Sequence, residues 1–339
     1  MQRKFLTDKG RKTDIAWKDL YTLDDWYIQR YWIKDYCRII NVKKQIEVYG
    51  TVEQIICQIL QHCHREELKE KIKQRDLGIV FCGGGGKGAY QIGVWKWLKE
   101  HGIADKITGV SGASVGALNS LLFVEGDYDL AEQIWNSVDS DTIVNSDKIP
   151  FWQDQDELSN LLEVYMGKMK NLRKQEKLVY SALTCVQGLP KKAMAGFVIN
   201  GVVPDTSEMK TNYYCWASRT EKELREIVLA SAALPGIKKI RQFEGKEFVD
   251  GGFTDNVHVR PLAEDRFRNI IVVQLSDDEE SFKKSTEDFK NVKFYRVKPS
   301  EKLGKMKQAG AALTKARIKR GEEDAANQLQ EVLSLIDSL

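Results

Sequence analysis

The chain has 339 residues, of which 42% are hydrophobic and 30% are charged, a composition typical of a folded globular protein rather than a disordered one. Its 52 Lys and Arg against 49 Asp and Glu give a net charge of +3, which is too small to indicate a dedicated nucleic-acid-binding protein. The six cysteines are too sparse and irregular for a disulfide scaffold, and no window of about 18 apolar residues predicts a transmembrane helix.

Residues 1–76 form the first predicted segment. It begins MQRKFLTDKGRK, without the apolar stretch of a secretory signal, so we expect a cytoplasmic protein whose membrane contact is peripheral. Apolar residues recur at helical spacing from Ile55 to Cys63, after an aromatic-rich stretch around Trp17 and Trp26. We predict an N-terminal helical extension that packs on the following domain, covers it as a lid or regulates access to it.

From residue 77 onward, short apolar runs alternate with helical patterns. The alternation predicts an α/β layered domain over residues 77–320, followed by a C-terminal helix within 321–339. Predicted strands are Leu77–Cys82, Ile107–Ser111, Lys177–Val186, Asn212–Ala217, Asn269–Leu275 and Val292–Val297, and predicted helices are 88–101, Val115–Val124, Glu221–Ala230, Lys302–Arg320 and Asp324–Ser338.

A glycine-rich loop follows the first of these strands. Its residues are Gly83, Gly84, Gly85, Gly86, Lys87 and Gly88. Glycines let backbone N–H groups converge without side-chain obstruction, and the start of a helix behind them adds partial positive charge. The loop is therefore suited to bind a phosphate or a developing oxyanion. It also contains the weak dinucleotide-binding pattern G-x-G-x-x-G, with Asp105 as the acidic residue nearest the expected distance.

A second motif, Gly112-Ala113-Ser114-Val115-Gly116, lies between the next strand and an apolar helix. Small residues two before and two after a serine permit the sharp turn that exposes its hydroxyl as a nucleophile. By itself, Ser114 would also be consistent with a residue that caps the helix.

The third motif is Asp250-Gly251-Gly252, which follows the run KEFV. A serine nucleophile needs a base, and Asp250 could act directly or orient a histidine. His258 is the histidine that follows Asp250 in the order of an α/β-hydrolase triad, although the gap is unusually short. Zinc binding by Cys57, His62, Cys63 and His64 is a weaker alternative, because their spacing fits no standard pattern.

Together the three motifs resemble those of the patatin-like phospholipase family, G-G-G-x-[KR]-G, G-x-S-x-G and D-G-[AG], in the same order. Ala230-Ser231-Ala232-Ala233-Leu234-Pro235 is similar to the A-S-x-x-x-P block that precedes the aspartate in these enzymes. The resemblance covers about residues 77–320 and implies a three-layer α/β/α domain with a mostly parallel central sheet. It departs from the family at Cys82, where serine or aspartate is more usual.

The resemblance implies a lipid acyl hydrolase that needs no metal or other cofactor. Carried over to this sequence, Ser114 would be the nucleophile and Asp250 the base. The N–H groups of Gly84, Gly85 and Gly86 would stabilise the oxyanion, and Lys87 would fill the family's basic position. The acyl channel is predicted along Ile92, Trp95, Leu118, Leu121, Leu122 and Phe123.

The expected substrate is a phospholipid or lysophospholipid of a membrane, reached by transient peripheral contact with the inner membrane face. Residues 298–320 carry eight Lys or Arg against one Glu, which would suit anionic headgroups. Because some bacterial relatives are switched on by nucleotide second messengers, an activating ligand acting through residues 1–76 is a further hypothesis. Two alternatives remain: an esterase or thioesterase for soluble acyl substrates, and a non-enzymatic nucleotide-binding module.

Overall fold

In the computed structural model, the described residues are 17–23, 26–31, 36–41, 46–72, 76–138, 157–166, 169, 176–189, 209–235 and 239–336. The chain divides into two compact units, Met1–Glu67 and Leu68–Leu339. The division falls before the boundary expected at residue 76, and Leu68, the first residue of the second unit, is buried in a hydrophobic cluster of that unit.

The first unit is an antiparallel sheet followed by a helix. Its described strands pair in the order β1-β2-β3-β4. Cys37 and Ile39 of β3 are buried with Ile55 of the helix. Helical structure over residues 1–76 is therefore confirmed only for α1 among the described residues, and the prediction is wrong for the strands that precede it. The bounds are β1 Trp17–Leu23, β2 Trp26–Tyr31, β3 Cys37–Asn41, β4 Ile46–Gly50 and α1 Val52–Lys71.

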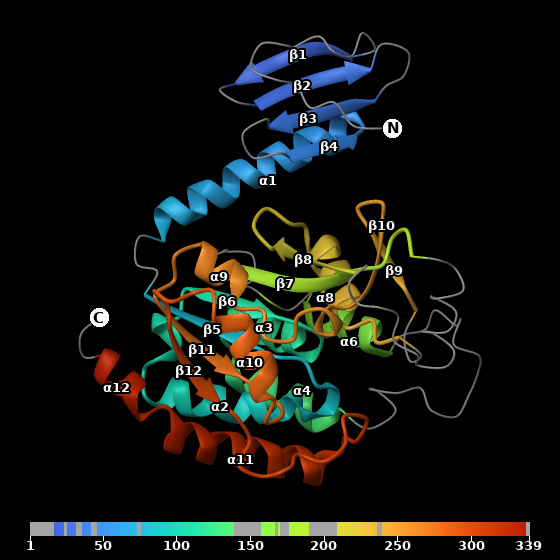
Figure 1. Ribbon diagram of the computed structural model, residues 1–339. Helices are drawn as coiled ribbons and strands as arrows, with labels where there is room; N and C mark the ends of the chain where they lie inside the picture. Colours follow the sequence, from blue (N-terminus) through green and yellow to red (C-terminus); the bar gives the residue numbers. More distant parts are fainter. Residues whose placement is uncertain are drawn as a thin grey trace. The chain divides into compact units, whose positions relative to one another are not determined.

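The second unit is built on a mixed sheet that is mostly parallel, as predicted (Figure 1). Within the described residues its order is β12-β11-β5-β6-β7-β10-β9, with β8 also paired to β7. The pairs from β12 to β7 are parallel, whereas β8, β9 and β10 join antiparallel. The bounds are β5 Leu77–Phe81, β6 Gly109–Gly112, β7 Leu178–Cys185, β8 Lys210–Cys215, β9 Arg241–Phe243, β10 Lys246–Asp250, β11 Asn269–Val273 and β12 Lys293–Val297.

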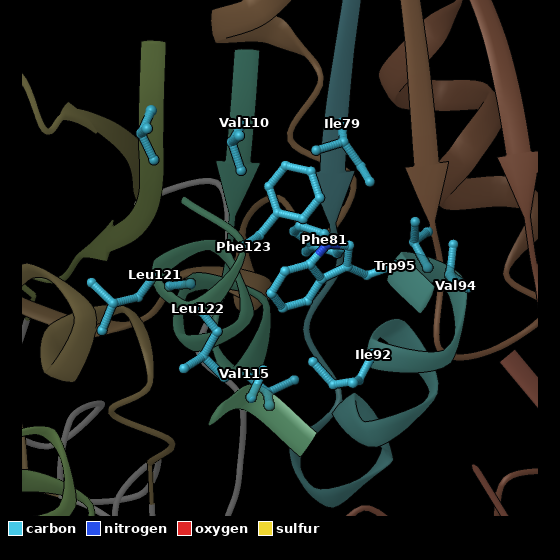
Figure 2. Packing of buried hydrophobic residues seen from close by; sticks show 14 of the residues in the cluster. Ile79, Phe81, Ile92, Val94, Trp95, Val110, Val115, Leu121, Leu122 and Phe123 are labelled. Carbon is cyan, nitrogen blue, oxygen red and sulfur yellow. The ribbon is translucent and has the colours of Figure 1, made fainter. Parts of the chain in front are cut away.

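Alternate residues of the central strands pack on opposite faces, which gives the three layers. Ile79 and Phe81 join a cluster with α2, α3 and α8, where the Phe81 and Phe123 rings lie 5.5 Å apart (Figure 2). Val80 joins a second cluster with α9 and α10. The helices are η1 Gly85–Gly88, α2 Ala89–Glu100, η2 Ala104–Lys106, α3 Val115–Glu125, α4 Tyr128–Ser137, α6 Glu157–Met166, α8 Glu221–Ser231, η5 Gly251–Phe253, α9 Arg260–Glu264, α10 Glu279–Thr286, α11 Ala311–Gln328 and α12 Gln330–Ile336.

The C-terminal helices differ from the predicted ones. Residues 302–310 precede the first helix, and α11 continues through residue 320, where the sequence suggested a boundary. The helix crosses α2 with backbone against backbone, because a Cβ on Gly321 would lie 2.0 Å from the carbonyl oxygen of Tyr90. Close backbone contact is therefore the reason for this glycine, not the end of a helix.

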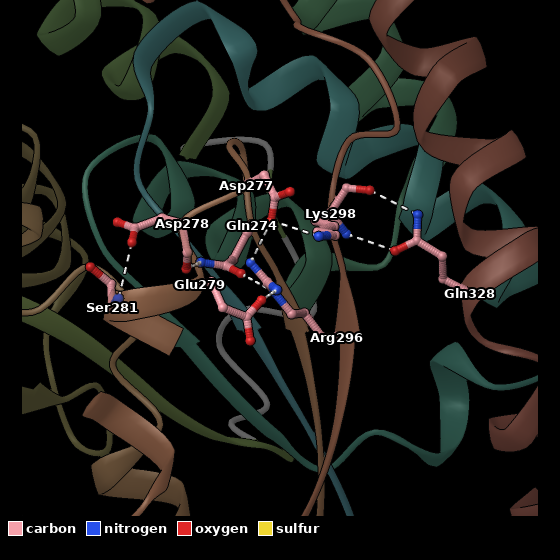
Figure 3. Close-up of polar contacts among 8 residues, drawn as sticks. All are labelled: Gln274, Asp277, Asp278, Glu279, Ser281, Arg296, Lys298 and Gln328. Atoms are coloured by element: carbon pink, nitrogen blue, oxygen red, sulfur yellow. Dashed lines mark hydrogen bonds and ion pairs between the residues drawn. The ribbon is translucent and has the colours of Figure 1, made fainter. Parts of the chain in front are cut away.

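Hydrogen bonds also connect the end of α11 to the edge of the sheet. Gln328 exchanges hydrogen bonds of 3.0 and 2.8 Å with the backbone of Lys298, just beyond β12 (Figure 3). The Lys298 ammonium lies 2.6 Å from Asp277, which also pairs with Arg296 at 3.1 Å. These exposed ion pairs contribute little individually, but they fix the path of the chain at this edge.

Candidate active site

Ser114 stands at a sharp turn between β6 and α3. Its φ of 56° and ψ of −129° are unusual for a residue with a side chain, and such local strain is common at functional sites. The turn is close-packed, because a Cβ on Gly116 would lie 1.8 Å from the carbonyl oxygen of Phe81. This contact accounts for one of the two glycines that the motif predicts around the serine.

The turn is held by a second serine on α8. The backbone N–H of Ser114 donates to Ser231 Oγ at 3.0 Å, and the Ser231 hydroxyl donates to the carbonyl of Ala182 at 2.8 Å. Ser231 is fully buried and links the turn at Ser114 to β7. It belongs to the A-S-x-x-x-P block noticed in the sequence, but its positioning role needed the structure.

Asp250 ends β10 and is 3% exposed. Its Oδ1 accepts a 2.9 Å hydrogen bond from the Gly252 N–H. Burial raises its pKa from 3.8 to about 6, and hydrogen bonding by Ser114 and Gly252 opposes part of this rise. Ser114 and Asp250 line the same hollow, and Asp250 Oδ2 is buried without a hydrogen-bond partner among the described residues. Hydrogen bonds at catalytic sites are often loose before substrate binds.

The glycine loop follows β5 and opens α2. The Gly83 N–H donates to Asn256 Oδ1 at 2.7 Å, which connects the loop to the segment that follows Asp250. The Gly86 N–H donates to the carbonyl of Met306 at 2.8 Å, so in this conformation it is engaged. Within the described part of the chain, the N–H groups of Gly84 and Gly85 have no acceptor.

Ser114 lies where two hollows meet. The first hollow, of about 180 Å³, brings it together with Asp250, Gly83, Gly84 and Asn256. A second cavity of about 120 Å³ is almost wholly apolar and is lined by Ser114, Gly85 and side chains of α3, α4 and α6. Leu118, Leu121 and Leu122 of the predicted acyl channel line this cavity, whereas Ile92, Trp95 and Phe123 pack in the core instead.

A third hollow of about 680 Å³ adjoins the hollow that Ser114 shares with Asp250. The two share Gly252, Phe253 and Asn256 in their linings. The third hollow is mainly polar and carries the cations Arg260 and Lys284, together with Asp255 and several hydroxyl groups. The Tyr213 hydroxyl donates to Asp255 at 2.5 Å, so this carboxylate already has a partner. Apolar and polar compartments therefore flank Ser114 and Asp250.

His258 lies apart from the predicted nucleophile and base. It is fully buried, its Nδ1 is 2.9 Å from Ser111 Oγ, and it lines neither of the hollows that contain Ser114. Burial lowers its pKa, which favours the neutral ring.

Two other sequence candidates, Lys87 and Asp105, can also be placed. Lys87 is half-buried, and burial and the nearby charge of Arg317 lower its pKa. Asp105 is exposed in η2, before β6 rather than after a strand. Among the described residues, no group of three or more His, Cys, Asp or Glu side chains is arranged to hold a metal ion.

Gly88, Gly112, Gly251 and Gly252 complete the three motifs. A Cβ on Gly88 would lie 2.5 Å from Val115, one on Gly112 would lie 2.4 Å from Ser120 Oγ, and one on Gly251 would lie 1.9 Å from the Ala182 carbonyl oxygen. Gly252 instead contributes its N–H to Asp250. The glycines thus allow backbone segments that carry functional groups to approach closely.

Comparison with known proteins assigns the chain to a family. The model of the family described as patatin-like phospholipase matches residues 79–263, more than half of the chain. The chain belongs to the patatin-like phospholipase family. Asn256 and Ser231 lie within the matched region, whereas Met306 and Arg317 lie beyond it.

The chain is also similar to two curated fungal lysophospholipases. It is 25% identical over 201 residues to lysophospholipase NTE1 of Cryptococcus neoformans, covering 59% of this chain and 11% of the relative. It is 24% identical over 224 residues to lysophospholipase nte1 of Aspergillus terreus, covering 62% and 13%. The chain therefore spans only about an eighth or less of these relatives.

Similarity to solved structures is remote. VipD from Legionella pneumophila is 13% identical with a TM-score of 0.43, covering 76% of this chain and 67% of VipD. The type III effector protein ExoU is 12% identical with a TM-score of 0.41, covering 91% of this chain and 57% of ExoU. As for membranes, none of the described helices has both the length and the apolar character needed to span a bilayer.

Proposed function

We propose that this chain is a serine hydrolase that cleaves fatty-acyl esters of phospholipids or lysophospholipids. The observation that carries the proposal is the position of Ser114, which lines both an apolar cavity and a hollow shared with Asp250 and the glycine loop. An acyl chain in the apolar cavity would bring its ester carbonyl to the serine hydroxyl. Membership of the patatin-like phospholipase family supports the same chemistry.

The first half-reaction would acylate the serine. Asp250 accepts the Ser114 proton as Oγ bonds to the ester carbonyl carbon, whose oxygen becomes an oxyanion bound by the Gly84 and Gly85 N–H groups. The bond between that carbon and the alkoxy oxygen then breaks. The leaving alcohol takes the proton from Asp250, and the acyl group remains on Ser114.

The second half-reaction would release the fatty acid. Asp250 removes a proton from water, whose oxygen attacks the acyl carbon and forms a second oxyanion in the same loop. The bond from this carbon to Ser114 Oγ breaks, and Oγ recovers the proton from Asp250. The products are a fatty acid and the free serine. A carboxyl pKa of about 6 lets Asp250 act as a base at neutral pH and still hold the proton between steps.

The polar hollow supports a substrate with a charged headgroup. With the tail in the apolar cavity and the ester at Ser114, the headgroup would extend toward Arg260 and Lys284. Arg260 is paired at 3.5 Å with Glu264 and Asp288, whereas Lys284 makes no ion pair with the described residues. Lys284 is therefore the cation more available to a phosphate.

The exposed lysines beside Met306 support transient contact with an anionic membrane surface. Lys305 and Lys307 are exposed on either side of Met306, a residue that lines both hollows at Ser114. Neither lysine forms an ion pair with the described residues, so both are available to lipid phosphates. This contact would bring the protein peripherally to a cytoplasmic membrane face.

The test is hydrolysis of a lipid panel by the full chain, with fatty-acid release measured by mass spectrometry. Ser114→Ala should abolish release and labelling by a fluorophosphonate probe, while Ser334→Ala, an exposed serine on α12, should change neither. Cleavage of short-chain soluble esters without cleavage of any phospholipid would favour the esterase alternative. Full activity of a folded Ser114→Ala protein would reject the proposed nucleophile.

A further inference from the structure

The glycine loop poses a physical problem for the proposed mechanism. Oxyanion donors must be held in place before the reaction, yet a run of glycines has the greatest backbone freedom of any sequence. Gly85, at a φ of +57°, has no side chain that could fasten it. The restraint has to come from other elements.

Arg317 of α11 supplies such a restraint. Its side chain is 2% exposed, and its guanidinium donates at 2.7 Å to the carbonyl of Gly86. The same guanidinium holds residues 303–308, donating to the carbonyls of Leu303 at 3.0 and 2.8 Å, Gln308 at 2.7 Å and Lys305 at 3.3 Å. Residues 303–308, which include Met306, therefore share one anchor with the glycine loop.

The charge of this guanidinium is not neutralised by a carboxylate among the described residues; its described partners are carbonyl oxygens. Burial lowers the pKa of Arg317, but arginine starts so far above neutrality that the side chain stays protonated. A buried cation held by carbonyl groups polarises the peptide units that it contacts.

Two peptide units connect Arg317 to a candidate oxyanion donor. The Gly86 carbonyl that accepts from Arg317 belongs to the same peptide group as the Lys87 N–H. That N–H donates at 3.4 Å to the carbonyl of Gly84, whose peptide group carries the Gly85 N–H. Gly85 lines the apolar cavity together with Ser114, and its N–H has no acceptor in the described part of the chain.

We propose that Arg317 is a positioning residue for hydrolysis, which orients and polarises the Gly85 N–H through this chain of hydrogen bonds. The inference rests on the proposed function and extends it to a residue outside the family match. The position of α11 is itself fixed, since a Cβ on Gly93 of α2 would lie 1.8 Å from the carbonyl oxygen of Ile318. Arg317 thus links the packed helices α2 and α11 to a loop in which Lys87 is the only residue with a side chain.

The experiment compares Arg317→Gln and Arg317→Lys in the full chain with Arg320→Gln as the matched control. Arg320 lies on the same helix but pairs with Glu301 and Glu323 near the surface. We measure kcat and KM for p-nitrophenyl butyrate, and inhibition by an alkyl trifluoromethyl ketone and by its alcohol. The ketone forms an oxyanion with the serine, whereas the alcohol does not.

Arg317→Gln should lower kcat about 10- to 100-fold while KM stays within about threefold of the parent value. It should weaken inhibition by the ketone by the same factor as kcat, and it should leave inhibition by the alcohol unchanged. The kcat and the ketone inhibition of Arg317→Lys should lie between those of Arg317→Gln and the parent, because an ammonium keeps the charge but not the planar array of donors. Arg320→Gln should behave as the parent. If Arg317→Gln does not fold, the change in kcat and the change in ketone inhibition are both measured on Arg317→Lys.

The inference is overturned if folded Arg317 variants keep kcat within about threefold of the parent, or if inhibition by the ketone and inhibition by the alcohol weaken equally. That failure is distinct from failure of the proposed function. In the latter case the parent lacks ester hydrolysis, or Ser114→Ala retains it, and both ideas are rejected.

Discussion

Replacing Asp250 by Asn should abolish hydrolysis and, at neutral pH, stabilise the protein. The carboxyl is buried, and its pKa is about 6 in the folded chain against an ordinary value of 3.8. The folded state therefore binds this proton more tightly than the unfolded state does. As pH rises through the window from 3.8 to 6, the folded protein loses stability relative to the unfolded chain, and above that window the loss is complete.

The magnitude follows from the width of this window. About two pKa units correspond to about 3 kcal/mol at pH 7.5, and the same linkage gives about 1 kcal/mol at pH 4.5. Asn carries no such proton, so the unfolding free energy of Asp250→Asn minus that of the parent should rise by about 2 kcal/mol between these pH values. Any pH-independent effect of the amide cancels in this comparison.

The assay is urea unfolding of both proteins across the pH range, together with Asp129→Asn as a control at an exposed position of α4. The control measures the effect of an Asp-to-Asn change at a position where the carboxyl is exposed. In parallel, kcat/KM of the parent should rise about tenfold from pH 5 to pH 7, because the base must be ionised. A stability difference that is flat with pH, or a rate midpoint near 4, would refute the buried-base reasoning.

Three further outcomes are expected. Leu118→Trp should lower hydrolysis of long-chain relative to butyryl esters about tenfold, while Val124→Phe, on the same helix but outside the cavity lining, should not. Lys284→Gln should raise KM for a lysophospholipid about three- to tenfold and leave p-nitrophenyl butyrate unchanged, whereas exposed Lys283→Gln should alter neither. Gly116→Ala should cost more than about 3 kcal/mol in urea unfolding because its Cβ would meet the Phe81 carbonyl, against about 1–2 kcal/mol for Gly126→Ala, whose Cβ would meet no atom within 4 Å.

The parallel strands of the central sheet were predictable from local sequence patterns, whereas the short antiparallel strands β9 and β10 were not among the predicted strands. Leu77–Phe81 and residues 270–273 of β11 are apolar runs, which is typical of parallel strands covered on both faces. The three motifs were also predictable, because most of their glycines lie where a tight turn or a close approach to another segment leaves no room for a Cβ. Gly116 against Phe81 illustrates this relation.

The first unit was not predictable in the same way. Trp17–Leu23 and Trp26–Tyr31 are rich in aromatic residues and form strands, whose stability depends on pairing with chain segments that local periodicity does not identify. At the other end of the chain, Gly321 falls between the two predicted helices Lys302–Arg320 and Asp324–Ser338. It lies inside α11 because the Tyr90 carbonyl leaves no room for a Cβ.

The sequence did not predict which residues hold the motif residues of the candidate site in place. A motif records the residues that must be small or reactive, whereas the groups that hold them can come from any part of the chain. Asn256 reaches Gly83, Ser231 reaches Ser114, and Arg317 reaches Gly86 from 231 positions away. Because this loop has one side chain, that of Lys87, among five glycines, its geometry depends on such distant contacts. The same motif in another chain would therefore acquire a different loop geometry if a different C-terminal helix packed behind it.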